Sequence, residues 1–439
     1  MIKYKLIITL LFFSTITIAQ KSDTLTLDYC HDLAIKNFPI AKKKGLYLKK
    51  NELAIKNIKK NYLPQLNLNA QATYQSDVTS IPLDFSQIKV EIPNQPISPS
   101  ITAPDMPEVA KDQYKVSLDI NQVIYDGGFT KNQKKIEKID LLINNQNVDV
   151  ELYSLKGNLN DVFFTLFLLQ ENEKLLEVAI SEIKTQLKKV ESGIENGIIL
   201  KSNSFALKAE ILKLEQTQIE VENGILTAFK ILNEYCGTNF SESSIIILPE
   251  PKIALSVLEN QRPELKLFEF QKQKITETKS LISTKTKPKM YGFGQVGYGN
   301  PALNMFTDEF DSYYIVGAKI SWNLWNWNHS KTDKQILDIQ TNLIDNQKDI
   351  FNKNLKIAGE KSFSEISIYG LLIKKDNEII ELRTKIKETA ASQLTNGVIT
   401  SSDFITELNA ETQAKLNLEY HKIQLIKSKI NYLTITGNL

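Results

Sequence analysis

The amino-acid sequence repeats itself at a separation of 200 residues. Tyr114 matches Tyr314, and Gly237 matches Gly437, with the offset unchanged between the two pairs. A constant offset over so long a stretch is the signature of an internal tandem repeat. The 439 residues are therefore expected to hold two copies of one unit rather than two unrelated domains.

The two repeats are predicted to cover residues 20–238 and 239–439 and to form one inseparable fold. Near the start of each repeat, the matching prolines Pro64 and Pro288 are 224 residues apart, so the first repeat contains 24 extra residues. These fall within 76–111, a stretch rich in proline. Because proline lacks a backbone donor, we expect a surface loop there.

Residues 1–19 have the pattern of a secretory signal peptide. A short basic start is followed by an apolar run over 6–13 and then by small residues at the expected cleavage point. Secretion would bring Cys30 and Cys236 into an oxidising compartment, where a disulfide is allowed. Two cysteines do not define a disulfide framework, and two small buried residues are the simpler interpretation.

Catalytic chemistry finds little support in the sequence. Three His and two Cys are present, none at metal-ligand spacing. No phosphate-binding glycine loop and no nucleophile elbow occurs. The 53 Lys and Arg balance 51 Asp and Glu, which argues against nucleic-acid binding. We therefore predict no enzyme, no catalytic residues, no cofactor and no metal.

Four stretches alternate apolar and polar residues, as strands with one oily and one wet face do. They cover about 65–77, 112–124, 290–299 and 312–325, and Leu-Asn-Leu-Asn at 66–69 is the clearest example. About ten residues is the length that a tilted strand needs to cross a hydrocarbon layer. The pattern therefore predicts membrane-spanning strands, two in each repeat.

Aromatic residues gather where the second strand of each repeat ends. Tyr125 lies there in the first repeat, and all three tryptophans, Trp322, Trp325 and Trp327, lie there in the second. Such a cluster is typical of an aromatic girdle at a bilayer interface. Ordinary core aromatics of a soluble sheet are the alternative.

The remaining sequence is predicted to be helical. Two long helical hairpins are expected over about 130–236 and 330–436, where apolar residues recur at spacings of three and four. The first helix of each would have about 65 residues and a length on the order of 100 Å. Thr130 and Ser330 begin patterns that resemble capping boxes, so the long helices are expected to start there.

Each hairpin is expected to reverse at an Asn-Gly pair. The pairs are Asn196 with Gly197 and Asn396 with Gly397. A helix reversal needs a positive φ, which Asn and Gly tolerate, so the reversal alone explains the residue types.

Proline and glycine mark the junctions between helices and strands. Pro64 and Pro288 are expected to end helices and admit strands, and Gly127 with Gly128 to turn a strand into a helix.

Four membrane strands per chain cannot close a barrel. Open sheet edges are not tolerated in lipid, and the smallest closed barrels use about eight strands. Two copies would supply eight strands and three would supply twelve, and only the larger barrel would enclose a useful wet lumen. The predicted fold is a mixed α/β membrane protein, mainly α: a trimeric twelve-strand β-barrel, four strands per chain, continuous with a long helical coiled-coil barrel.

With these features together, the sequence resembles the TolC family of outer-membrane efflux proteins, also called outer membrane factors. The resemblance covers nearly the whole chain after the signal peptide. It rests on the two Asn-Gly reversals, the closing glycines and these segments: 25–27, 34–39, 63–66 and 122–128.

The resemblance implies a homotrimer in outer-membrane lipid that extends into the periplasm. It also implies the function of an exit duct, for multidrug export by a tripartite efflux pump or for type I secretion. The partners implied are a periplasmic adaptor, which the Asn-Gly tips would contact, and an inner-membrane transporter of the RND or ABC class. The alternative is a structural periplasmic coiled-coil or adaptor protein without a pore.

Asp403 is the candidate pore gate. In the family, acidic side chains shortly after the second tip glycine narrow the periplasmic end, and Asp403 stands at one such position, whereas Thr406 occupies the second. A ring of Asp403 side chains would disfavour anions and bind divalent cations. The alternative is that Asp403 caps its helix together with Thr400.

Overall fold

The computed structural model describes these parts of the chain: 24–78, 110–242, 244–251 and 260–439. The predicted signal peptide and most of the predicted insertion loop lie outside them. The described residues form two compact units. One, the sheet unit, comprises 45–144 and 268–346, and the other, the helical unit, comprises the remainder. Each unit takes segments from both predicted repeats.

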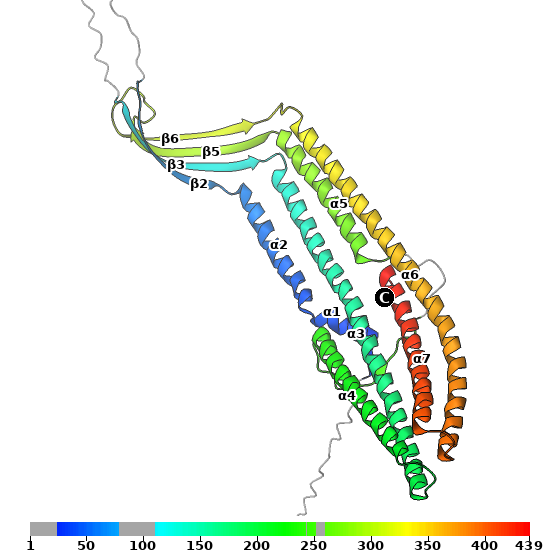
Figure 1. The fold of residues 1–439 in the computed structure, drawn as a ribbon. Coiled ribbons are helices and arrows are strands. Elements are labelled where there is room, and N and C mark those ends of the chain that lie inside the picture. The colour runs from blue at the N-terminus through cyan, green and yellow to red at the C-terminus, as the bar shows by residue number, and fades with distance from the viewer. Residues whose placement is uncertain (1–23, 79–109, 243, 252–259) are drawn as a thin grey trace, which may run out of the picture. The chain divides into compact units, whose positions relative to one another are not determined.

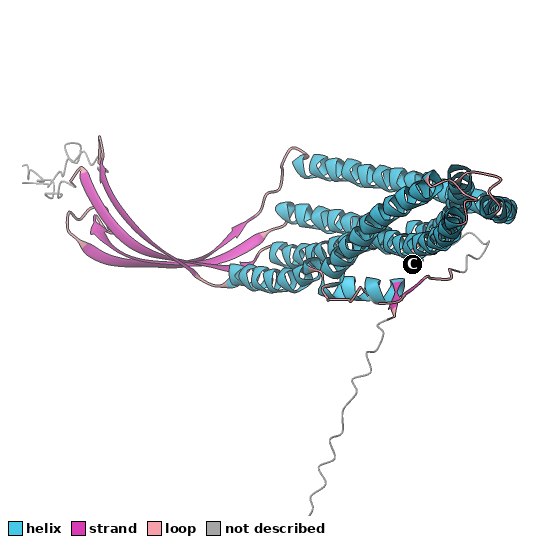
Figure 2. Cartoon of the chain, turned by 60° about the horizontal axis from the view of Figure 1, so that its bottom comes forward, coloured by secondary structure: helices cyan, strands magenta, loops and turns pink. Residues whose placement is uncertain are grey.

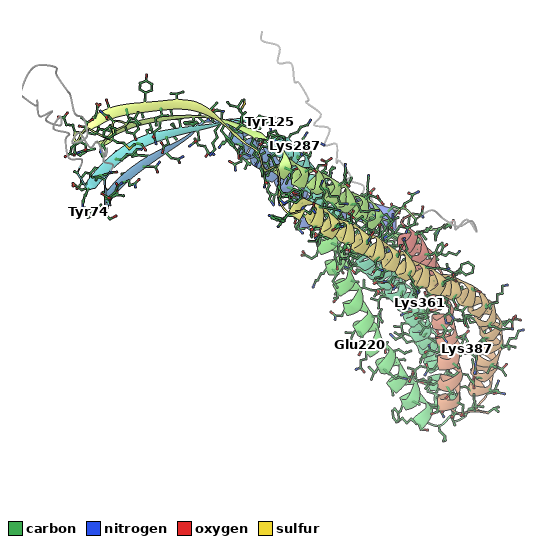
Figure 3. All side chains as sticks on the ribbon, turned by 90° about the horizontal axis from the view of Figure 1, so that it is seen from above. Tyr74, Tyr125, Glu220, Lys287, Lys361 and Lys387 are labelled. Atoms are coloured by element: carbon green, nitrogen blue, oxygen red, sulfur yellow. The ribbon has the colours of Figure 1, made fainter. Side chains whose placement is uncertain are left out.

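The sheet unit contains a four-stranded antiparallel sheet. Its strands, in the order in which they pair, are β2 (Gln65–Tyr74), β3 (Asp112–Tyr125), β5 (Lys289–Asn300) and β6 (Asp311–Ser321). The strands curve together, as Figure 2 shows. Tyr74 and Tyr125 lie at opposite ends of the sheet (Figure 3).

Register aligns the alternating residues across all four strands. Leu68 pairs with Leu118, Leu118 with Val296, and Val296 with Tyr314, so these four side chains share one face. The next row along, Asn67, Asp119, Gln295 and Ile315, lies on the opposite face. The period of two in the sequence thus becomes an apolar face and a mainly polar face.

The fourth strand is shorter than the sequence pattern predicts. The pattern extends to 325, whereas β6 ends at Ser321, which pairs with Lys289. Pro288 precedes Lys289 and has no N–H to donate. Pairing therefore stops there, and Trp322 and Trp325 follow the strand rather than belong to it.

Helices supply the rest of the sheet unit. They are α2 (Lys43–Lys59), α5 (Pro263–Ile282) and the first parts of α3 (Phe129–Glu195) and α6 (His329–Thr395). Ion pairs join α5 to both long helices: Lys274 to Asp140 of α3 at 2.7 Å, and Lys272 to Asp345 of α6 at 2.9 Å.

The helical unit is built around two helical hairpins, α3 with α4 (Ser202–Cys236) and α6 with α7 (Ser401–Thr436), as Figure 1 shows. The short helix α1 (Leu27–Asn37) contacts α4. Just before α1, β1 (Leu25–Thr26) pairs in parallel with β4 (Ile246–Ile247).

Two clusters of buried apolar residues hold the helical unit together. One joins α1, α3, α4 and α7 around Phe163 and Phe164, whose rings meet edge to face at 6.0 Å. The other joins both hairpins near their tips, through Ile183, Leu207 and Phe404. Among the described residues, no helix combines the length and the apolar character needed to cross a bilayer.

The first cluster gives a stability prediction. Phe163→Ala should lower the free energy of unfolding by about 3–5 kcal/mol, because the ring is fully buried and its loss leaves a cavity. Phe205, which is 62% exposed, is the matched control, and Phe205→Ala should change little. Chemical denaturation followed by circular dichroism measures both, and equal losses would contradict the assigned core.

Candidate channel surfaces, junctions and helix tips

The polar face of the sheet is centred on Asp119. Gln295 donates to one of its carboxylate oxygens at 2.5 Å, and Asn69 donates to the other. These side chains line a hollow of about 860 Å³, together with Asn67 and Lys319. The face can hold water and polar solutes, as the wall of an aqueous lumen must.

The opposite face leaves large apolar side chains open to solvent. Leu68 is 74% exposed and Val316 is 78% exposed. A soluble sheet with one wet face covers its other face with a core. No residue of the described chain covers these side chains, so this face is suited to a lipid environment.

The four candidate girdle residues are all exposed at one end of the sheet. Tyr125 is the last residue of β3. Trp322 donates its indole N–H to the carbonyl of Thr286 at 3.0 Å, and Trp325 meets Trp327 edge to face at 5.9 Å. Exposed rings with a polar handle suit a water–hydrocarbon boundary.

The junction between β3 and α3 is organised by Asp126. Its carboxylate accepts from the hydroxyl of Tyr62 at 2.9 Å and from the backbone N–H groups of Gly128 at 2.9 Å and Thr130 at 2.7 Å. Burial by itself would raise the pKa of Asp126, but these hydrogen bonds outweigh burial and hold the pKa below its usual value. Gly127 has a positive φ of 70° and Gly128 one of 90°.

The prediction that Thr130 begins and caps the first long helix is wrong. The helix starts at Phe129, and Asp126 provides the capping oxygen that Thr130 was expected to supply. Asp126 reaches the free N–H groups because the two glycines turn the chain back toward it.

The matching junction of the second repeat builds the same turn without glycine. Trp327 and Asn328 have positive φ angles of 53° and 58°, 200 residues after Gly127 and Gly128. Asn326 donates to the hydroxyl of Ser330 at 2.7 Å, and α6 begins at His329 rather than at the predicted Ser330. A positive φ is strained for tryptophan.

Pro64 and Pro288 occupy equivalent places. Pro64 lies between a 3₁₀ turn, Lys60–Tyr62, and β2. Pro288 lies between a second 3₁₀ turn, Ser283–Thr286, and β5. Proline restricts the residue before it to extended geometry, which suits the entry into a strand.

The two hairpin tips have the same backbone. Gly197 and Gly397 have φ angles of 70° and 71°. Before them, Asn196 and Asn396 each donate a side-chain N–H to the carbonyl four residues earlier, at 2.9 Å. Each hairpin therefore reverses at a glycine in the left-handed conformation, which ends the helix, and the asparagine side chain stabilises the last turn.

The tips also contact each other, through a residue that sequence reasoning did not assign. Asn203 at the start of α4 accepts from the backbone N–H of Ser401 at the start of α7, at 2.7 Å. Asn203 is the first-repeat counterpart of Asp403. The two positions therefore have different roles. Asn203 joins the two hairpins, and Asp403 caps α7.

Asp403 forms the capping box that the sequence pattern predicts. Its carboxylate accepts from the N–H of Thr400 at 2.9 Å and from the hydroxyl at 2.7 Å, and its own N–H donates to that hydroxyl at 3.3 Å. These hydrogen bonds hold the pKa of Asp403 below its usual value. The side chain is exposed and lines a hollow of about 470 Å³ with Lys385 and Glu407.

A buried charge cluster joins three helices near this hollow. Glu411 of α7 is 1% exposed and accepts from Thr384 at 2.8 Å. Two lysines contact the Glu411 carboxylate, Lys415 at 3.0 Å and Lys387 of α6 at 3.3 Å. Lys387, labelled in Figure 3, also bonds Glu182 of α3 at 2.9 Å.

Sequence reasoning missed this cluster, although a signal was present. Glu411 continues the apolar stripe that Phe404 and Leu408 begin at helical spacing, and Lys387 precedes Ala390 and Leu394 in the same way. A charged residue at an apolar position of such a stripe has to be paired. Within the described residues, no group of three or more His, Cys, Asp or Glu is placed to hold a metal ion.

The charge cluster predicts a pH dependence of stability. Burial by itself would raise the pKa of Glu411, but the bonds from Lys415 and Thr384 and the nearby charges hold it below its usual value. The stabilisation is therefore complete above the unfolded pKa of about 4.3 and is lost as pH falls through the lower folded value.

Glu411→Gln should accordingly lower the free energy of unfolding at pH 7 by about 1.5–3 kcal/mol. The difference from the unsubstituted protein should shrink below about pH 4. Glu407 is the control, because it is half-buried and pairs with Arg383 at 3.2 Å; Glu407→Gln should cost no more than about 1 kcal/mol. A pH-independent effect of Glu411→Gln would contradict the assignment.

Comparison with known sequences gives no family: no protein-family model matches the chain, and no curated protein sequence matches it.

Comparison with solved structures does give matches. The outer membrane protein VceC from Vibrio cholerae has a TM-score of 0.63 at 12% identity, over 94% of this chain and 96% of VceC. The outer-membrane channel OprN has a TM-score of 0.66 at 13% identity, over 94% and 90% of the two chains. The Campylobacter jejuni outer membrane channel CmeC has a TM-score of 0.63 at 13% identity, over 94% and 85%.

Because the sequence identities are this low, the structural matches demonstrate likeness of fold alone. The likeness extends over most of each chain. The chain therefore has the fold of these outer-membrane channels, the fold that its resemblance to the TolC family implies.

Proposed function

We propose that this protein is an outer-membrane channel, the exit duct of a tripartite efflux pump or a type I secretion system. The observation that supports this most strongly is the four-stranded sheet, which exposes one polar and one apolar face. Solvent on one side and lipid on the other satisfy both faces at once. Substrates would pass passively through the duct after an inner-membrane transporter delivers them.

The edges of the sheet favour closure by further copies of the chain. Within the described residues, β2 pairs only with β3, and β6 pairs only with β5, so each has one unpaired edge. The strands alternate in direction from β2 to β6, so β6 of one copy and β2 of the next can pair in antiparallel fashion. Three copies would form a closed twelve-strand barrel with no edge in lipid.

An exposed stripe on α6 supports the same assembly. Ile336, Leu343, Ile350 and Ile357 recur every seven residues, and each is more than half exposed. A seven-residue apolar repeat is typical of helices that pack against other helices. We infer that a neighbouring copy covers this stripe in a helical barrel, and that the internal repeat serves to supply similar elements twice around one ring.

The periplasmic tips are the proposed contact with an adaptor. Three apolar side chains at the tips are well exposed, namely Ile198, Leu200 and Val398, at 65%, 76% and 70%. Exposed apolar side chains beside a rigid reversal suit recognition by another protein. The four tip residues Asn196, Gly197, Asn396 and Gly397 would hold this surface in shape.

The alternative of a coiled-coil protein without a pore accounts for the helices alone. It leaves unexplained the exposed apolar face of the sheet and its unpaired edges.

The assembly can be tested on the purified protein. We expect a trimer by native mass spectrometry, recovery from the outer-membrane fraction, and stepwise ion conductance in planar lipid bilayers. A monomer recovered from the soluble periplasm without conductance would overturn the proposal and favour the coiled-coil alternative.

Asp403 is proposed to gate the duct as well as cap α7, and two variants separate these roles. Asp403→Asn removes the charge but keeps an oxygen for the cap, whereas Thr400→Ala weakens the cap and keeps the charge. We expect Asp403→Asn to abolish block by divalent cations and to lower cation preference, and Asp403→Ala in addition to raise conductance.

Thr400→Ala should retain the block by divalent cations. If Asp403→Asn retains it as well, Asp403 has no part in the gate and serves only as a cap; the duct itself would remain supported by the conductance of the unsubstituted protein.

A further inference from the structure

The only two cysteines of the chain meet in the structure. Cys30 lies on α1 and Cys236 is the last residue of α4, 206 residues further along the sequence. Both are completely buried. Apolar side chains such as Leu159, Phe229 and Leu232 make up the surrounding cluster.

The backbones around the two cysteines are held in direct contact. The thiol of Cys236 lies 3.7 Å from the carbonyl oxygen of Cys30. About two helical turns further along α1, Asn37 donates a side-chain N–H to the carbonyl of Cys236 at 2.7 Å. Disulfides join residues whose Cα atoms are about 4.4–6.8 Å apart, so contact this close is a requirement for one.

Neighbouring residues fix the same contact on both sides. Phe38 stacks on Tyr235 at 6.2 Å between ring centres, and Tyr29 meets Phe240 at 6.3 Å. After Cys236, the chain turns through Gly237 with a φ of 63°, and a side chain added there would come within 2.9 Å of Asn37. The glycine therefore lets α1 approach the end of α4 closely.

We propose that Cys30 and Cys236 form a disulfide in the secreted protein. The inference rests on the proposed function, because the outer membrane faces an oxidising compartment. Each thiol loses a proton and the pair loses two electrons as the S–S bond forms. A protein disulfide oxidant accepts the electrons by thiol–disulfide exchange and becomes a dithiol.

The surroundings indicate when the bond forms. Both thiols are completely buried in the folded protein, so a protein oxidant cannot reach either of them there. Because thiol–disulfide exchange needs direct contact between the attacking sulfur and the disulfide of the oxidant, oxidation has to precede closure of the core. The bond would then connect α1 permanently to α4 and close a loop of about 200 residues, the kind of long loop whose cross-linking restricts the unfolded chain most.

The thiol state can be read from the full-length protein isolated from the outer-membrane fraction. Free thiols are blocked with N-ethylmaleimide in denaturant, which exposes the two buried cysteines, and the protein is digested with trypsin without reductant. We expect peptide 22–36 joined to peptide 231–252, two hydrogen atoms lighter than their sum. We also expect no alkylated cysteine before reduction and two after it.

Single and double substitutions provide the controls. Cys30→Ser and Cys236→Ser should each leave one cysteine that alkylates without reduction. Reductant should lower the thermal unfolding midpoint of the unsubstituted protein but not that of the Cys30→Ser, Cys236→Ser double variant.

If both cysteines are alkylated without reduction in protein that is trimeric and conducts ions, the disulfide proposal is wrong, whereas the proposed channel function is still supported. Protein that is soluble and does not conduct would contradict the proposed function instead, and the peptide map of the same sample would still decide the disulfide.

Discussion

Unpaired backbone at the two edges of the four-stranded sheet is the constraint on which the structure depends. The outward edges of β2 and β6 carry N–H and C=O groups without partners from the described chain. Lipid offers such groups no hydrogen bonds, so a sheet that faces lipid has to be closed. The proposed ring of neighbouring copies would account for three features together: the exposed apolar face, the polar face around Asp119 and the heptad stripe on α6.

Two different sets of residues build the same turn at matching places in the two predicted repeats. At the strand-to-helix junction, the left-handed positions are Gly127 and Gly128 in one repeat and Trp327 and Asn328 in the other. The left-handed turn is the same at both junctions although its residues differ. The strain at Trp327 accompanies an exposed ring where the proposed girdle needs one.

Much of the fold could be predicted from the sequence, because period-two and helical patterns, Asn-Gly reversals and prolines act through neighbours along the chain. The capping box of Asp403 belongs to this class, since its partners lie three residues apart. One error came where a distant residue decides, because Pro288 ends the pairing of β6 early. The other was local: Asp126, four residues before Thr130, caps α3 because two glycines fold the chain back toward it.

The sequence by itself determined the elements and their order, and with them the amphipathic sheet and the helical hairpins. Only the tertiary structure decided which residues meet across the chain: Glu411 with Lys387, Asn203 with Ser401, and Cys30 with Cys236. The physical reason is the range of each effect. Local geometry depends on residues within a few positions, whereas pairing of buried charges and thiols depends on which helix faces come together.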